Sequence, residues 1–70
     1  MPSYILTHFG KRLRQERLER GYSQEMLADR AKVHRTYIGM LERAEKNVTL
    51  ESAQRIARAL GLRVRDLIDF

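Results

Sequence analysis

The chain of 70 residues is basic, because fourteen lysines and arginines against nine acidic residues give a formal net charge of +5 and a pI near 10.2. It contains no cysteine, which excludes disulfides and thiolate metal sites. No apolar run approaches the roughly eighteen residues that a membrane helix needs and no signal peptide is visible, so we expect a cytoplasmic protein without a membrane partner.

The length predicts a single domain over residues 1–70 with a small core, and dimerisation is then a common way to add stability. The positive charge favours an anionic partner, most commonly nucleic acid, although many small proteins are basic without one. The sequence shows no nucleophile–base pair, no phosphate-binding glycine loop and no metal-ligand spacing, and its two histidines are His8 and His34. We therefore expect no enzyme activity, no cofactor and no metal.

Residues 5–20 predict the first helix. Ile5, Phe9 and Leu13 recur every four residues, and Leu18 extends the same apolar side. Most charges of this segment are expected to lie in solvent: Lys11, Arg12, Arg14, Glu16, Glu19 and Arg20.

Gly21 is expected to end this helix in the left-handed conformation. Ser23 is expected to cap a second helix over residues 24–32, with its hydroxyl accepting a backbone N–H. Val33 follows and can fill the space between this helix and the next. The apolar side of the second helix is predicted to comprise Met26, Leu27, Ala28 and Ala31.

Residues 35–44 predict a third helix with two different faces. One face can pack on a core: Ile38, Leu41, Glu42 and Glu45. The other carries mainly cations and hydrogen-bonding groups: Arg35, Thr36, Gly39, Met40 and Arg43. A short helix with such groups at its N-terminal end suits the major groove of DNA. Gly39 costs about 1 kcal/mol relative to alanine in a helix, which a close helix contact or a close approach to the groove floor would explain.

Residues 44–49 predict a loop, and Thr49 is the expected N-cap of a fourth helix over residues 50–60 that Gly61 ends. The inward side of this helix is predicted to comprise Leu50, Ala53, Ile56, Ala57 and Leu60. Its two arginines, Arg55 and Arg58, are expected to be solvated.

Residues 62–70 predict a short fifth helix in which Leu67 closes the core. Its other apolar residues, Val64, Ile68 and Phe70, exceed what one small domain needs. They form either a hydrophobic lid or, as we favour, a two-fold dimer contact. The five segments together predict an all-α fold, with a helix-turn-helix over residues 23–43.

The central segment carries a resemblance to a known family. It contains Q-x-x-x-A from Gln24, then I-x-x-L-E-R from Ile38, and the run H-R-T-Y-I-G-M-L-E-R over residues 34–43. These motifs resemble the helix-turn-helix of the lambda-repressor and Cro-like (XRE) family, and the run resembles the controller proteins of restriction–modification systems. The resemblance covers about residues 5–68. It implies a compact five-helix domain and a homodimeric transcriptional regulator that binds a near-palindromic operator in double-stranded DNA near a promoter.

The third helix and the resemblance together define the candidate DNA contacts. Arg35 is the expected direct reader, with two hydrogen bonds from its guanidinium to guanine. Tyr37 lies beside it and could pack at the domain edge or give its hydroxyl to a phosphate. The candidate base contacts are Arg35, Thr36, Tyr37 and Met40. The candidate phosphate contacts are Ser23, Gln24, Arg43, Lys46 and Asn47.

The resemblance also implies an ion pair between Arg17 and Glu42, partly buried, that fixes how the third helix sits. Two independent surface charges would be the alternative, and these would contribute almost nothing to stability.

Three positions depart from the family's pattern. Lys32 stands where glycine is usual, so either it accepts a strained left-handed conformation or the turn differs. Ala44 stands where glycine or asparagine is common, and Asn47 is expected to supply that turn instead. Arg63 stands where serine or aspartate is common, which implies a poorly capped fifth helix.

Two related regulators stay open as alternatives: a small phage-type Cro-like repressor, and an antitoxin-like regulator or adaptor that binds a protein. An adaptor needs no base-reading side chains on the face of Arg35 and Thr36, and antitoxins usually carry an additional toxin-binding segment. The controller resemblance implies regulation of the protein's own gene and of a neighbouring restriction endonuclease. No small-molecule effector is expected, because the sequence shows no ligand-binding domain.

Overall fold

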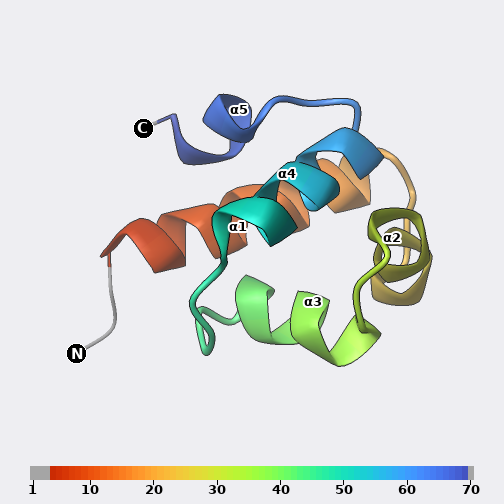
Figure 1. Ribbon diagram of the computed structural model, residues 1–70, viewed down its shortest axis with the longest axis horizontal. Helices are drawn as coiled ribbons and strands as arrows, with labels where there is room; N and C mark the ends of the chain where they lie inside the picture. Colours follow the sequence, from red (N-terminus) through yellow and green to blue (C-terminus); the bar gives the residue numbers. More distant parts are fainter. Residues whose placement is uncertain (1–3, 70) are drawn as a thin grey trace.

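The computed structural model describes residues 4–69, which form five helices and no strand (Figure 1). The helices are α1 (Tyr4–Glu19), α2 (Gln24–Ala31), α3 (Arg35–Glu42), α4 (Leu50–Ala59) and α5 (Val64–Ile68). The predicted all-α architecture is confirmed, and the helix ends lie within a residue or two of the predicted ones.

The long helix α1 runs through the middle of the molecule and separates α3 from α5 (Figure 1). It packs against α3 on one side and against α5 on the other, while α4 packs on α2 and α5. The helix-turn-helix formed by α2 and α3 and the short C-terminal α5 therefore lie on opposite sides of the fold (Figure 1).

The core is apolar and draws on every helix. Its central side chains are less than 2% exposed: Phe9, Leu13, Leu27, Ile38, Leu41, Ile56 and Leu67. Leu67 therefore closes the core as predicted, and Val33 packs against it between α2 and α3.

Four residues predicted to lie on the apolar sides are exposed: Ile5, Leu18, Met26 and Leu50. Ile5 and Leu50 stand in the first turns of their helices, where side chains tilt toward the N-terminus and project past the last core layer. Leu18 lies 140° around the helix axis from Leu13 when each residue advances by about 100°. Met26 lies about 100° from Leu27 and so falls on the flank of α2.

Helices α1 to α4 end in the same way, with one residue in the left-handed conformation followed by a hydrogen bond back to the last turn. Gly21 and Gly61 supply this conformation for α1 and α4, with φ of 69° and 73°. Lys32 and Ala44 supply it for α2 and α3, each with φ of 58°. Lys32 therefore accepts the strained turn, at a cost of about 1–2 kcal/mol.

The prediction that Asn47 supplies the turn after α3 is wrong, because Ala44 itself takes the left-handed conformation. The Arg63 side chain forms no capping hydrogen bond, as predicted for α5. Part of this lack is made up from within the helix, because the Asp66 carboxylate accepts the backbone N–H of Arg63 at 2.9 Å.

Gly10 lies where α1 crosses α3. A Cβ on Gly10 would overlap the carbonyl oxygen of Leu41 and lie 2.9 Å from that of Glu42. Both obstacles are backbone atoms of α3, which move only if the helix moves. The absence of a side chain at Gly10 therefore sets how closely the two helices approach.

Gly10→Ala is expected to lower the free energy of unfolding by about 1–3 kcal/mol relative to Gly39→Ala. Both substitutions remove a helical glycine, but a Cβ on Gly39 would meet only the tips of the Arg43 and Gln24 side chains. Urea denaturation of the two variants measures the difference. Equal stability would contradict the role of Gly10 in helix spacing.

Part of the charge on α1 is structural rather than solvated. The Glu16 carboxylate accepts hydrogen bonds from Arg12 Nε at 2.9 Å and from Arg20 Nη1 at 2.8 Å. Arg20 Nε in turn donates to the Leu60 carbonyl at 2.8 Å, at the C-terminus of α4. This network links the end of α1 to the end of α4, so the prediction of solvated charges is wrong for Glu16 but agrees with the exposure of Lys11, Arg14 and Glu19.

Hydrogen bonds from Arg20 and then from Arg12 lower the pKa of Glu16 below its ordinary value of 4.5. Because the folded chain binds this proton less readily than the unfolded chain, Glu16 stabilises the fold above about pH 4.5. That contribution is lost as the pH falls through the folded pKa. When the pH is lowered from above 4.5 to well below it, the urea midpoint should therefore fall further for wild type than for Glu16→Gln.

Candidate nucleic-acid interface

The starts of α2 and α3 are fixed by side-chain caps. The Ser23 hydroxyl accepts the Met26 N–H at 3.0 Å, as predicted. His34 Nδ1 accepts the Thr36 N–H at 3.1 Å and caps α3, a role that the sequence analysis missed. Histidine is not among the usual N-caps, so only its place directly before the helix signals this role.

The predicted base-contacting residues differ in how far they reach into solvent. Arg35 and Thr36 are exposed at the first turn of α3, whereas Tyr37 and Met40 are half-buried. Tyr37 packs against the core, which is the first of the two roles considered for it, and its role as a DNA contact stays a prediction. The first turn of α3 thus offers one long cation and one hydroxyl to a partner.

Arg35 is paired in the free protein. Its Nη1 donates to Glu25 Oε2 at 3.2 Å, and both side chains are about two-thirds exposed, at 68% and 65%. A pair this exposed contributes little stability and exchanges easily with another acceptor. Glu25 is a second residue that the sequence analysis missed, because the contact depends on how α2 and α3 cross.

Gly39 lies beneath the side chains of Gln24 and Arg43 rather than on an open surface. A Cβ there would lie 3.1 Å from Arg43 Nη1 and 3.5 Å from Gln24 Oε1. Of the two explanations for this glycine, the structure therefore favours the close contact within the protein. Gly39 was predicted to lie on the exposed face of α3 but is buried, so this face is narrower than predicted.

A buried ion pair holds α3 against α1. Arg17 Nε donates to Glu42 Oε2 at 2.6 Å and Arg17 Nη2 donates to Glu42 Oε1 at 3.0 Å. The two side chains are 9% and 4% exposed, and Arg17 also donates to the Tyr22 carbonyl at 2.8 Å. The hydrogen bonds to Glu42 raise the pKa of the Arg17 guanidinium. The arrangement is the partly buried pair that the resemblance implied.

The same carboxylate holds a candidate DNA contact. Gln24 Nε2 donates to Glu42 Oε1 at 3.1 Å. An amide nitrogen carries two protons, so the second stays available to a phosphate at the start of α2. Arg17, Glu42 and Gln24 thus form one chain of hydrogen bonds from the interior to the surface.

The remaining candidate phosphate contacts surround α3 on the outside. Ser23, Arg43, Lys46 and Asn47 are all exposed. Arg43 Nε lies 3.0 Å from Glu45 Oε1 in a half-exposed pair. Together with the N-terminus of α2, whose dipole favours anions, these groups could follow a phosphate backbone.

A family model described as helix-turn-helix matches residues 13–67 of this chain. The chain belongs to the helix-turn-helix family. The control protein C.BamHI of Bacillus amyloliquefaciens is 44% identical over 71 residues, which cover all of this chain and 88% of that protein. C.SmaI of Serratia marcescens is 50% identical over 46 residues, which cover 66% of this chain and 55% of that protein.

Helix-turn-helix structures superpose closely on this one. The restriction–modification controller protein C.AhdI from Aeromonas hydrophila has a TM-score of 0.87 at 42% identity, covering 89% of this chain and 94% of that chain. The predicted resemblance to controller proteins is therefore confirmed. These relatives are named as control proteins, not as enzymes.

A second surface of this helix-turn-helix domain is apolar. A groove of about 200 Å³ runs between the start of α1, residues 47–49 of the loop before α4, the start of α4, and α5. Its rim includes the exposed side chains of Ile5, Leu50 and Ile68, and Leu50 is 85% exposed. The predicted dimer residues Val64 and Ile68 line this groove.

Phe70, the third predicted dimer residue, lies outside the described residues. Ile5 and Leu50 join this apolar surface although the sequence analysis assigned them to the core. The part of the chain that the structure describes has no group of three or more side chains placed to hold a metal ion. Within the same residues, no helix is long and apolar enough to cross a bilayer.

Proposed function

We propose that this chain is a sequence-specific, DNA-binding transcriptional regulator and a controller protein of a restriction–modification system. The observation that carries the proposal is the first turn of α3, which presents Arg35 and Thr36 in solvent at the end of a rigidly packed helix. The controller proteins named above support the subtype. Residues 1–70 would act as one DNA-binding domain.

In the proposed complex, α3 enters the major groove. Arg35 leaves Glu25 and donates two hydrogen bonds to guanine N7 and O6. Thr36 meets a neighbouring base edge or a thymine methyl, and Met40 and Tyr37 flank them. The groups that position the domain without reading sequence are Ser23, Gln24, Arg43, Lys46 and Asn47.

The proposed active form is a homodimer joined through the apolar groove of α1, α4 and α5. The longest dimension of one subunit is 30 Å, which is close to the separation of about 34 Å between two half-sites one helical turn apart. A near-palindromic operator follows from the two-fold axis. Because α5 and α3 lie on opposite sides of α1 (Figure 1), a dimer contact centred on α5 leaves both recognition helices free.

Regulation would follow from occupancy of an operator near a promoter. A bound dimer blocks or recruits the polymerase according to the position of its site. We propose that the controlled genes are its own and that of a neighbouring restriction endonuclease. The level of the dimer would then set the output without a small-molecule effector.

Arg35→Ala is expected to relax the selected operator at one base pair per half-site, a loss of about 1–3 kcal/mol of discrimination. Binders are selected from a random duplex pool near physiological salt with wild type and variant side by side. Arg14→Ala is the matched control, because it removes an exposed arginine from α1.

Recovery of a palindrome with half-sites one helical turn apart supports the proposal. Selection of no consensus by wild type, with affinity that simply collapses as salt rises, would contradict it. The positive charge would then act only as general phosphate affinity.

A further inference from the structure

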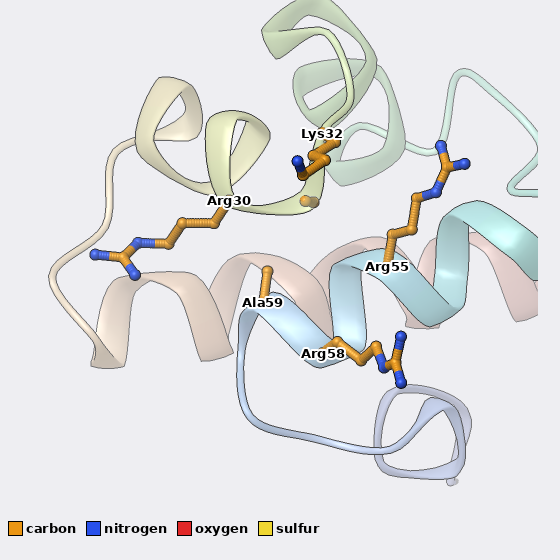
Figure 2. Close-up of a pocket in the computed structure, with 6 residues that line it drawn as sticks. Arg30, Lys32, Arg55, Arg58 and Ala59 are labelled. Carbon is orange, nitrogen blue, oxygen red and sulfur yellow. The ribbon is translucent and has the colours of Figure 1, made fainter.

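A second groove lies between the C-terminal end of α2 and the C-terminal half of α4 (Figure 2). It encloses about 290 Å³. Ala59 lines it from α4 and is half-buried, whereas Ala31 of α2 lies beneath it and is only 2% exposed. The four cations that surround it are Arg30, Lys32, Arg55 and Arg58.

These cations are only partly neutralised by the protein. Arg55 Nη2 lies 3.3 Å from Glu51 Oε1 in an exposed pair, and the Arg30 guanidinium lies 4.6 Å from the centre of the Tyr22 ring. Among residues 4–69, Lys32 and Arg58 form no ion pair. Arg55 and Arg58 are three residues apart on one helix face, where like charges repel each other. Bringing these four cations together therefore does not stabilise the fold.

The groove is separate from the candidate DNA interface. It adjoins the last residues of α2, whereas Ser23 and Gln24 stand at the first, about 12 Å away at 1.5 Å per residue. α4 packs on α2 rather than on the exposed side of α3. A ligand can therefore occupy the groove while α3 is engaged.

We propose that this α2–α4 groove binds an acidic segment of another protein, with carboxylates on the cations and a small apolar side chain against Ala59. The apolar lining is the reason to choose a peptide over a phosphate backbone, which has no apolar group to bury there. The concave shape suits a few side chains and not a duplex. The inference stands independently of the proposed operator binding.

The first test measures fluorescence anisotropy of a labelled 14-residue peptide built from glutamate and leucine. Arg55→Glu/Arg58→Glu is compared with Lys11→Glu/Arg14→Glu. The control pair makes the same change in charge at the same spacing on an exposed face of α1. The groove variant is expected to weaken binding at least about tenfold, and the control variant by far less.

The second test separates apolar recognition from charge alone. A peptide in which every leucine is replaced by glutamine should bind several-fold more weakly to wild type, and Ala59→Gln should remove that difference. A non-operator duplex should displace the peptide no better from the groove variant than from wild type, because the duplex is not expected to bind in the groove.

Three results would overturn the inference. These are the absence of peptide binding by wild type, equal losses in the two charge variants, and equal binding of the peptide without leucine. Arg35→Ala should keep full peptide affinity, so a failure of the operator proposal is distinguishable from a failure of this one. Circular dichroism melting of each variant confirms that it is folded.

Discussion

Replacing Glu42 by alanine is expected to lower the free energy of unfolding by about 3–5 kcal/mol. The Arg17 side chain is 9% exposed in the native fold, and the substitution removes the one carboxylate with which it pairs among residues 4–69. The Tyr22 carbonyl would remain as an acceptor, but it carries no charge. An uncompensated buried cation loses its hydration without an ion to replace it, and this penalty is the source of the loss.

Urea denaturation measures this loss, and Glu45→Ala is the matched control. Glu45 also pairs with an arginine, Arg43, but both side chains are about half exposed. Breaking that pair should cost no more than about 1 kcal/mol. If the two variants lose the same stability, the Arg17–Glu42 pair is not the electrostatic anchor of α3.

The double substitution Arg17→Met/Glu42→Leu tests the contribution of the ion pair to stability separately from its effect on the orientation of Gln24. Replacing both charges by apolar groups of similar size should recover most of the stability, because no buried charge is left. Gln24 nevertheless loses the acceptor that orients its amide. We expect the double variant to be folded and to bind the operator more weakly, an effect absent from the singly substituted Glu45→Ala.

Much of the fold is predictable because it depends on local pattern. The apolar stripe of α2 and the left-handed residue after α1 follow from neighbours within a few positions, and both are confirmed for Leu27, Ala28 and Gly21. The Arg17–Glu42 pair joins residues 25 apart in sequence. No periodicity reveals such a contact, and it was anticipated only through the family resemblance.

The predictions fail where the packing of helices against one another, rather than the periodicity within one helix, decides the surroundings of a residue. Periodicity gives the direction of Leu50 around the helix axis but not whether a neighbouring helix extends far enough to cover it. The importance of Gly10 depends on how closely α1 and α3 approach, which exists only in the assembled fold. The contact of Arg35 with Glu25 depends on the crossing of two helices in the same way. The exposure of Arg35 and Thr36 could therefore be predicted from the sequence, but the partners of the candidate site residues within the protein could not.

Leu50→Glu is expected to dissociate the proposed dimer and to weaken operator binding about a hundredfold. Leu50 is 85% exposed on the rim of the apolar groove, so the substitution should leave the folded subunit intact. In a two-fold dimer each change is made twice, which places two carboxylates in the same apolar contact. Burying like charges there costs several kcal/mol, and about 1.4 kcal/mol corresponds to a factor of ten.

Leu18→Glu is the matched control, because it places the same charge on an exposed leucine at the other end of α1, outside the groove. Sedimentation velocity reports the oligomeric state of each variant, and titration of the selected operator reports its affinity. If Leu50→Glu stays dimeric, or if Leu18→Glu dissociates as readily, the contact lies elsewhere on the molecule. If Leu50→Glu is monomeric and still binds the full operator tightly, two half-sites are not read by a preformed dimer. If Leu50→Glu alone loses both the dimer and its affinity for the operator, dimerisation through the apolar groove is required for operator recognition by α3.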